Sequence, residues 1–183
     1  MVLITTATTT PVNPPGAQPI LTHAELWATL VSKARHPEPF VSAIERSRII
    51  HEHADGLTRS VLFKGQDKEI EEEIRYIGST TVDFFVSTGQ HITNTISGGD
   101  SGDPADLYLT FTFEWPHPDV EAGSQQEEEL RGRYAAMGRQ VVPHTVAVAR
   151  ERIIQEEESS TNLRSRQDAL HELTAGGGLR GNR

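Results

Sequence analysis

The chain has 183 residues, of which 36% are hydrophobic, which is enough for one buried core but too short for two. Its 26 acidic residues outnumber its 17 lysines and arginines, and the net charge of -9 argues against a nucleic-acid-binding surface. The absence of cysteine excludes disulfides and thiolate metal sites, and no apolar run is long enough to cross a membrane, so we expect a cytoplasmic protein.

The beginning of the chain predicts a strand followed by a helix. Residues 2–10 are rich in β-branched side chains, and the prolines that follow end the strand. Thr22 is placed to cap a helix that begins at His23, with Glu25 at the third helical position as in a capping box. Two prolines then end this helix, and residues 40–44 are expected to form a second, short helical turn.

Alternation of apolar and polar side chains next predicts six consecutive strands joined by short turns. The expected strands are residues 46–52, 57–64, 69–77, 80–87, 91–97 and 107–115. The last strand is the clearest, because every second residue from Leu107 to Trp115 is apolar. One face of this strand is therefore expected to be buried.

A long amphipathic helix is predicted from about residue 123 to residue 158. Ser124 suits the N-cap, and the acidic residues after it suit the positive end of a helix dipole. Apolar side chains then recur at steps of three and four residues, which draws one apolar stripe along the helix. Pro143 lies inside this pattern and is expected to bend the helix, and residues 159–183 are expected to form a flexible tail.

The order of these elements predicts one α+β domain over residues 1–158. A strand, one or two helices, six strands linked as hairpins and one long helix follow one another along the chain. This order favours a curved, antiparallel, seven-stranded sheet that wraps around its own C-terminal helix.

Three stretches carry a resemblance to a known family: residues 21–62, the segment ITNTIS at 92–97 and the run LYLTFTFEW at 107–115. They resemble the AtaL-like family within the START-like (SRPBCC) superfamily, which includes pollen allergens, lipid-transfer domains and polyketide aromatase/cyclases. The resemblance covers roughly residues 1–157 and implies a helix-grip fold with a cavity between the sheet and the long helix. It also implies that this cavity holds an apolar or aromatic small molecule, and that in some members a few polar residues turn binding into cyclisation or isomerisation.

Four polar side chains interrupt the apolar stripes of the expected strands, and we regard them as candidate catalytic residues: Arg59, Glu72, Tyr76 and Asn94. Glu72 is the leading candidate, because burial disfavours the charged form of a carboxylate unless a partner such as Arg59 restores it. Either arrangement suits a general acid or base. The alternative is a buried polar pair that only satisfies its own hydrogen bonds.

A second group of residues is expected to line the ligand, because these side chains are apolar or aromatic and lie on the same predicted faces. They are Trp27, Val61, Phe84, Leu109, Phe111, Phe113, Tyr134 and Met137. The alternative for Trp27, Tyr134 and Met137 is a plain place in the hydrophobic core, which is common for aromatic and methionine side chains at helical spacing.

Two local motifs resemble sites of other chemistry. His51 and His53 are two residues apart in a strand, so both imidazoles point the same way and could share a metal, but no neighbouring spacing nominates a third ligand. The loop 99–104 resembles the nucleophile loop of trypsin-like proteases, yet it lacks the surrounding context of a catalytic triad and is interpreted as a turn. We therefore expect no metal site.

The leading hypothesis is a cofactor-independent enzyme of secondary metabolism, of the cyclase or isomerase type, that acts on an aromatic or polycyclic intermediate. Its expected partner is a hydrophobic or aromatic small molecule, with no nucleic acid, and its expected state is a monomer or weak homodimer. One alternative is a non-catalytic binding or carrier protein for a hydrophobic small molecule. Another is a protein-interaction domain that uses the acidic part of the long helix.

Overall fold

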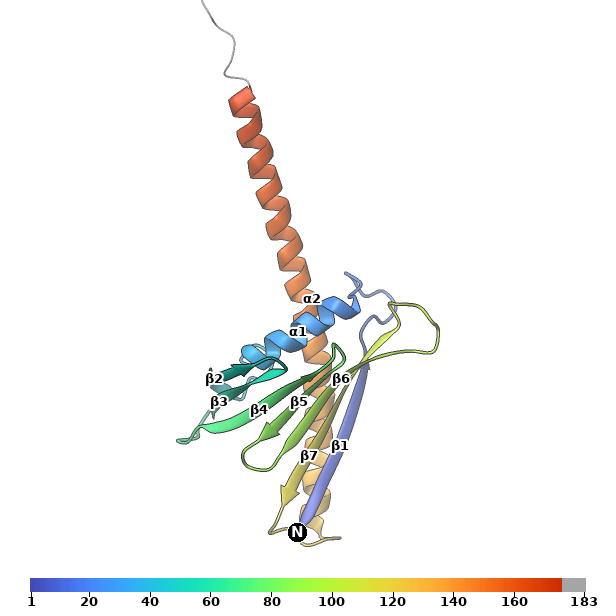
Figure 1. Cartoon of the computed structure of the whole chain (residues 1–183). Coiled ribbons are helices and arrows are strands. Elements are labelled where there is room, and N and C mark those ends of the chain that lie inside the picture. The colour runs from blue at the N-terminus through green and yellow to red at the C-terminus, as the bar shows by residue number, and fades with distance from the viewer. Residues whose placement is uncertain (176–183) are drawn as a thin grey trace, which may run out of the picture.

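The computed structural model describes residues 1–175 as one antiparallel sheet with two helices on its inner face (Figure 1). The strands are β1 Val2–Pro11, β2 Ile44–His53, β3 Gly56–Phe63, β4 Ile70–Ile77, β5 Thr81–Val86, β6 His91–Gly98 and β7 Leu107–His117. Their order in the sheet is β1-β7-β6-β5-β4-β3-β2, so the first strand pairs with the last and the other six follow as hairpins. The predicted α+β fold with seven antiparallel strands is confirmed.

Helix α1, His23–Arg35, begins at the predicted capping box. The Thr22 hydroxyl accepts a hydrogen bond from the Glu25 main-chain N–H, and the Glu25 carboxylate accepts one from the Thr22 main-chain N–H. The second helical turn expected at residues 40–44 is not a helix: this stretch makes hydrogen-bonded turns, in which the Ile44 main-chain N–H donates to the Val41 oxygen, and Ile44 already starts β2, opposite Phe63 on β3. Pairing within the sheet outweighs the local helical preference there.

Helix α2, Gln125–Ala175, continues beyond its predicted end at residue 158. The hydroxyl groups in this extension are satisfied inside the helix: Thr161 donates to the Glu157 carbonyl, and Ser165 donates to the Thr161 carbonyl. Pro143 lies within α2 and does not end it, while the predicted bend stays a prediction. The division into a domain of residues 1–158 and a flexible tail also stays a prediction, and residues 176–183 of that tail lie outside the described residues.

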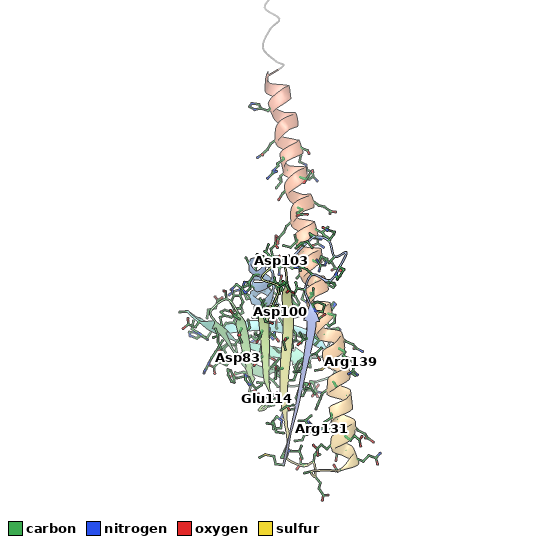
Figure 2. All side chains as sticks on the ribbon, turned by 90° about the vertical axis from the view of Figure 1, so that its right-hand side faces the viewer. Asp83, Asp100, Asp103, Glu114, Arg131 and Arg139 are labelled. Carbon is green, nitrogen blue, oxygen red and sulfur yellow. The ribbon has the colours of Figure 1, made fainter. Side chains whose placement is uncertain are left out.

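The first half of α2 lies along β1, at the edge of the sheet, and the second half projects past it (Figure 1). Figure 2 shows Arg131 and Arg139 on the part of α2 that runs beside the sheet. Gly138 permits this close approach, because a Cβ atom at this position would lie 2.4 Å from the Thr8 Oγ1. Neither helix among residues 1–175 is long and apolar enough to cross a membrane.

The hydrophobic core lies between the inner face of the sheet, which is the face turned toward α1 and α2, and the two helices. The apolar face predicted for β7 is buried from Leu107 to Phe113. The facing side chains of the helices are Leu26, Leu30 and Ala34 on α1, and Val142, Val146 and Ala149 on α2. This core cluster holds the polar residues that form the candidate site, while a smaller cluster of Val2, Ile4, Val120 and Leu130 lies near the start of α2.

Candidate functional site

The strand register brings the four predicted polar residues onto the inner face of the sheet. Arg59 on β3 lies opposite Glu72 on β4. A second row crosses the sheet from Tyr76 on β4 through Val82 on β5 and Asn94 on β6 to Phe111 on β7, and it ends at Thr8 on β1. Alternation along each strand places these side chains on one face, as expected.

Arg59 and Glu72 form a buried ion pair, with side chains only 4% and 8% exposed. The Arg59 Nε donates a hydrogen bond to the Glu72 Oε2 at 2.6 Å, and the Arg59 Nη2 lies 2.5 Å from the same oxygen. The third guanidinium nitrogen, Nη1, donates to the main-chain oxygens of Lys33 and Ala34 at the end of α1. One oxygen of the leading candidate carboxylate is therefore held by an arginine that also anchors a helix.

Asn94 and Tyr76 have unused hydrogen-bonding groups in the interior. Asn94 is fully buried, and neither its side-chain oxygen nor its side-chain nitrogen has a hydrogen-bond partner within residues 1–175. The Tyr76 hydroxyl is likewise without a partner in the described part of the chain, and burial raises the pKa of this phenol above its usual value. A buried polar group without a partner costs about 1–3 kcal/mol, so each such group calls for an explanation.

Lys33 on α1 is a further polar residue in this interior that the sequence analysis missed. Lys33 is only 6% exposed, and its Nζ lies 4.2 Å from the centre of the Phe111 ring and 5.0 Å from the centre of the Phe84 ring. No hydrogen bond or ion pair reaches this ammonium from the residues that the structure describes. Burial, followed by the positive charge of Arg59, lowers the pKa of Lys33 to about 7, and the Glu72 charge opposes this shift.

The strand order places the Lys33 ammonium above β6. Phe84 belongs to β5 and Phe111 to β7, and β6 lies between these two strands. Asn94 pairs with Phe111, whereas its neighbour on the same face, Ile92, pairs with Phe84. A group that contacts both rings therefore lies over the segment of β6 that carries Ile92 and Asn94.

The residues predicted to line a ligand fall into three places. Val61, Phe84, Leu109, Phe111 and Phe113 are buried in the core. Trp27 packs edge-on against Tyr76 at one side of this core, with ring centres 6.0 Å apart. Tyr134 stacks on Trp115 at 3.8 Å near the start of α2, and Met137 is 38% exposed. Their role in binding stays a prediction.

The two other motifs form exposed structure. His51 and His53 lie at the exposed end of β2, with ring centres 6.3 Å apart, and Glu52 between them pairs with Arg35. No group of three or more metal-ligating side chains occurs among the described residues. In the loop 99–104 the Ser101 hydroxyl donates to the Asp106 carboxylate at 2.6 Å, which fits the predicted turn.

Two open hollows lie on the surface of α2 beyond the sheet. One is lined by side chains between Ile154 and Ser165, and the other by side chains between Arg152 and Ser160. Both are bordered mainly by polar side chains of a single helix, and neither touches the inner face of the sheet. They match the solvent-exposed side of a helix better than a ligand site.

Solved structures with the same fold are similar over most of this chain. The crystal structure of Ara h 8.0201 has a TM-score of 0.52 and 12% identity, and the match covers 81% of this chain and 98% of that one. The solution structure of KanY has a TM-score of 0.56 and 11% identity, with 84% and 99% of the two chains covered. The di-domain ARO/CYC StfQ from the steffimycin biosynthetic pathway has a TM-score of 0.61 and 11% identity, over 82% of this chain and 52% of that one. These similarities confirm the expected helix-grip fold.

Sequence similarity identifies the family. Acetylaranotin biosynthesis cluster protein L from Aspergillus terreus (strain NIH 2624 / FGSC A1156) is 26% identical over 129 residues, which cover 69% of this chain and 75% of the relative. Residues 6–156 match the family that carries the same description. Because this match spans most of the chain, the protein belongs to the acetylaranotin biosynthesis cluster protein L (AtaL) family.

Proposed function

We propose that this protein is an enzyme of secondary metabolism, of the cyclase or isomerase type, which works without a cofactor on an aromatic or polycyclic intermediate. Membership of a family named for a biosynthesis cluster supports the metabolic role. The similar fold of StfQ, described as an ARO/CYC of the steffimycin pathway, supports the type of reaction. The observation that carries the proposal is the unused hydrogen-bonding capacity of Asn94 and Tyr76 on the inner face of the sheet, among buried apolar side chains.

The proposed mechanism is directed by shape. Apolar walls fix one conformer of the substrate, so that its reacting carbons are held close together. The Asn94 amide and the Tyr76 hydroxyl then donate hydrogen bonds to the oxygen that gains negative charge in the transition state. Burial raises the pKa of Tyr76, which keeps its hydroxyl protonated and able to donate. Glu72, bound to Arg59, is the proposed carboxylate for proton transfer.

A second candidate function is non-catalytic binding or transport of a hydrophobic small molecule. The observation that favours it is the Arg59–Glu72 contact, because two guanidinium nitrogens already occupy one oxygen of the only candidate carboxylate. A site of this kind would retain its apolar walls and its donors for the ligand, with Glu72 serving the ion pair rather than proton transfer.

Both candidate functions require a small molecule bound on the inner face of the sheet. Native mass spectrometry of freshly purified full-length protein, followed by solvent extraction, tests this requirement. We expect a bound apolar or aromatic metabolite, or saturable fluorescence with the neutral probe N-phenyl-1-naphthylamine. Ile92→Trp adds bulk at a half-buried position on the inner face of β6 and should weaken this binding. Leu3→Trp, at an exposed position of β1, should not. Equal binding by both variants would contradict a ligand site on the inner face.

Turnover separates the two candidate functions. Extracted metabolites and aromatic polyketide intermediates are incubated with the wild-type protein and with Glu72→Gln, Tyr76→Phe and Asn94→Leu, and products are followed by mass spectrometry. Conversion by the wild type that falls at least tenfold in these variants supports the enzyme. Saturable binding with no conversion would favour the carrier.

A further inference from the structure

The Lys33 side chain lies in the interior, with the residue 6% exposed, and its ammonium has no ion-pair partner among residues 1–175. A buried charge of this kind is costly unless an opposite charge or hydrogen bonds compensate it. The Glu72 charge acts on Lys33, but the Glu72 Oε2 is already in contact with both Arg59 Nε and Nη2. Lys33 therefore keeps an unused capacity to bind an anion.

Arg59 also determines the position of Lys33. Its Nη1 binds the main-chain oxygens of Lys33 and Ala34, so the last turn of α1 is fixed over the sheet. The side chain of Lys33 then extends inward between Phe84 and Phe111, above the part of β6 that carries Asn94. An unpaired ammonium and an unpartnered amide thus face the same part of the interior.

We propose that Lys33 and Asn94 form a binding site for the acidic oxygen of an aromatic ligand, such as a phenolate, an enolate or a carboxylate. This inference rests on the proposed function, because it names the chemical class of the molecule held on the inner face. The ammonium supplies the positive charge, and the Asn94 amide supplies a second N–H donor to the same oxygen. The rings of Phe84 and Phe111 flank the ammonium and provide the surface against which an aromatic ring packs.

The surrounding charges favour an anion over a neutral or cationic ligand. The ionisable groups around the site are Arg59 on β3 and Glu72 and Tyr76 on β4, together with Lys33 itself. The Arg59 and Glu72 charges offset each other, so a protonated Lys33 leaves one positive charge in the interior of a protein whose net charge is -9. A neutral aromatic ligand would leave this charge uncompensated, and a cationic ligand would be repelled.

Two fluorescent probes with one aromatic skeleton test the inference. The probe 8-anilinonaphthalene-1-sulfonate carries an anionic group, whereas N-phenyl-1-naphthylamine lacks it. Both are titrated at pH 6 into the full-length wild type, Lys33→Met, Asn94→Leu and the control Lys64→Met, which removes an exposed lysine. We expect the Kd of the anionic probe to rise about tenfold or more in Lys33→Met, and the Kd of the neutral probe to change less than about threefold.

The dependence on pH adds a second readout. Between pH 6 and pH 9 the wild type should lose affinity for the anionic probe as Lys33 loses its proton, while Lys33→Met and the neutral probe should show a flat profile. Unchanged anionic binding in Lys33→Met, with neutral binding intact, would overturn the Lys33 site and leave the proposed function standing. Absence of saturable binding by either probe would overturn the proposed function as well. If circular dichroism shows that Lys33→Met does not fold, the same comparison of the anionic and neutral probes is made with Lys33→Gln and Asn94→Leu.

Discussion

Arg59 on β3 donates a hydrogen bond from its Nη1 to the main-chain oxygen of Lys33, at 2.9 Å. The same nitrogen reaches the Ala34 oxygen at 2.8 Å, so one guanidinium satisfies two carbonyls that have no partner within the last turn of α1. Glu72 holds the opposite side of this guanidinium. The ion pair on the sheet therefore positions α1 and the lysine that it carries.

Breaking this ion pair from one side should destabilise the fold strongly. Glu72→Gln leaves the Arg59 charge buried without its partner, and we expect the free energy of unfolding in urea to fall by about 3–5 kcal/mol. Arg59→Met should cost a similar amount, because it strands the Glu72 carboxylate and two carbonyls. The double variant Arg59→Met/Glu72→Leu should cost less than the sum of the single changes, since no charge then stays buried.

The exposed ion pair of Arg35 and Glu52 is the matched control for the single and double variants of Arg59 and Glu72. Its side chains are 37% and 55% exposed, so Glu52→Gln should leave the free energy of unfolding nearly unchanged. If Glu72→Gln behaved like this control, the Arg59–Glu72 pair would not anchor α1. A large loss of turnover without loss of stability would then point to proton transfer by Glu72.

Asn94 is expected to lower the free energy of unfolding, because its buried amide, which we propose binds the ligand, has no hydrogen-bond partner in the described part of the chain. Asn94→Leu removes two buried polar atoms that have no partner among the described residues, so we expect the free energy of unfolding to rise by about 1–2 kcal/mol. The control is Asn13→Leu, because the Asn13 side chain binds the Leu21 main-chain N–H and the oxygens of Leu21 and Ala105. Urea unfolding should show a loss for Asn13→Leu, and a comparable loss for Asn94→Leu would contradict an unsatisfied amide.

The fold could be predicted from the sequence because its strands each bury one face. Period-two alternation from Leu107 to Trp115 marks the inner face of β7, and the capping box at Thr22 marks the start of α1. The end of α2 was not predictable in the same way. Thr161 and Ser165 belong to residue types that often end helices, but here they bind carbonyls one turn back and continue the helix.

The candidate site was only partly predictable. Alternation placed Arg59 and Asn94 on the inner face, but hydrogen bonding depends on side-chain geometry, which a linear pattern does not contain. Lys33 was overlooked because a lysine usually belongs to the solvent side of a helix. A signal was present: Lys33 follows Leu26 and Leu30 at helical steps of four and three, which places it on the buried stripe of α1.

The pH dependence of stability should report Lys33. The ordinary pKa of 10.5 falls to about 7 in the folded protein, so between pH 7 and pH 10.5 the unfolded chain binds more protons at Lys33 than the folded chain does. Stability from this group therefore rises with pH across that window and is lowest below pH 7, where the buried side chain is charged.

Lys33→Met removes this charge, so it should stabilise the protein most at acidic pH. We expect its advantage over the wild type in urea unfolding to shrink by roughly 2–3 kcal/mol between pH 6 and pH 9. Groups that titrate in both proteins cancel in the comparison. The exposed-lysine control Lys64→Met should show a constant difference, and a constant difference for Lys33→Met would mean that Lys33 does not change its charge in this range.

The approach of α2 to β1 depends on Gly138. Alanine is favoured over glycine inside a helix by about 1 kcal/mol, so Gly132→Ala, where nothing lies within 4 Å of the new Cβ, should stabilise the protein. At Gly138 the new Cβ would lie 2.4 Å from the Thr8 Oγ1, and Gly138→Ala should instead be destabilising by about 1–3 kcal/mol. The double variant Thr8→Ala/Gly138→Ala should recover part of this loss, because it removes the clashing oxygen. Equal stabilisation by the two glycine changes in thermal unfolding would show that α2 does not contact β1 at this point.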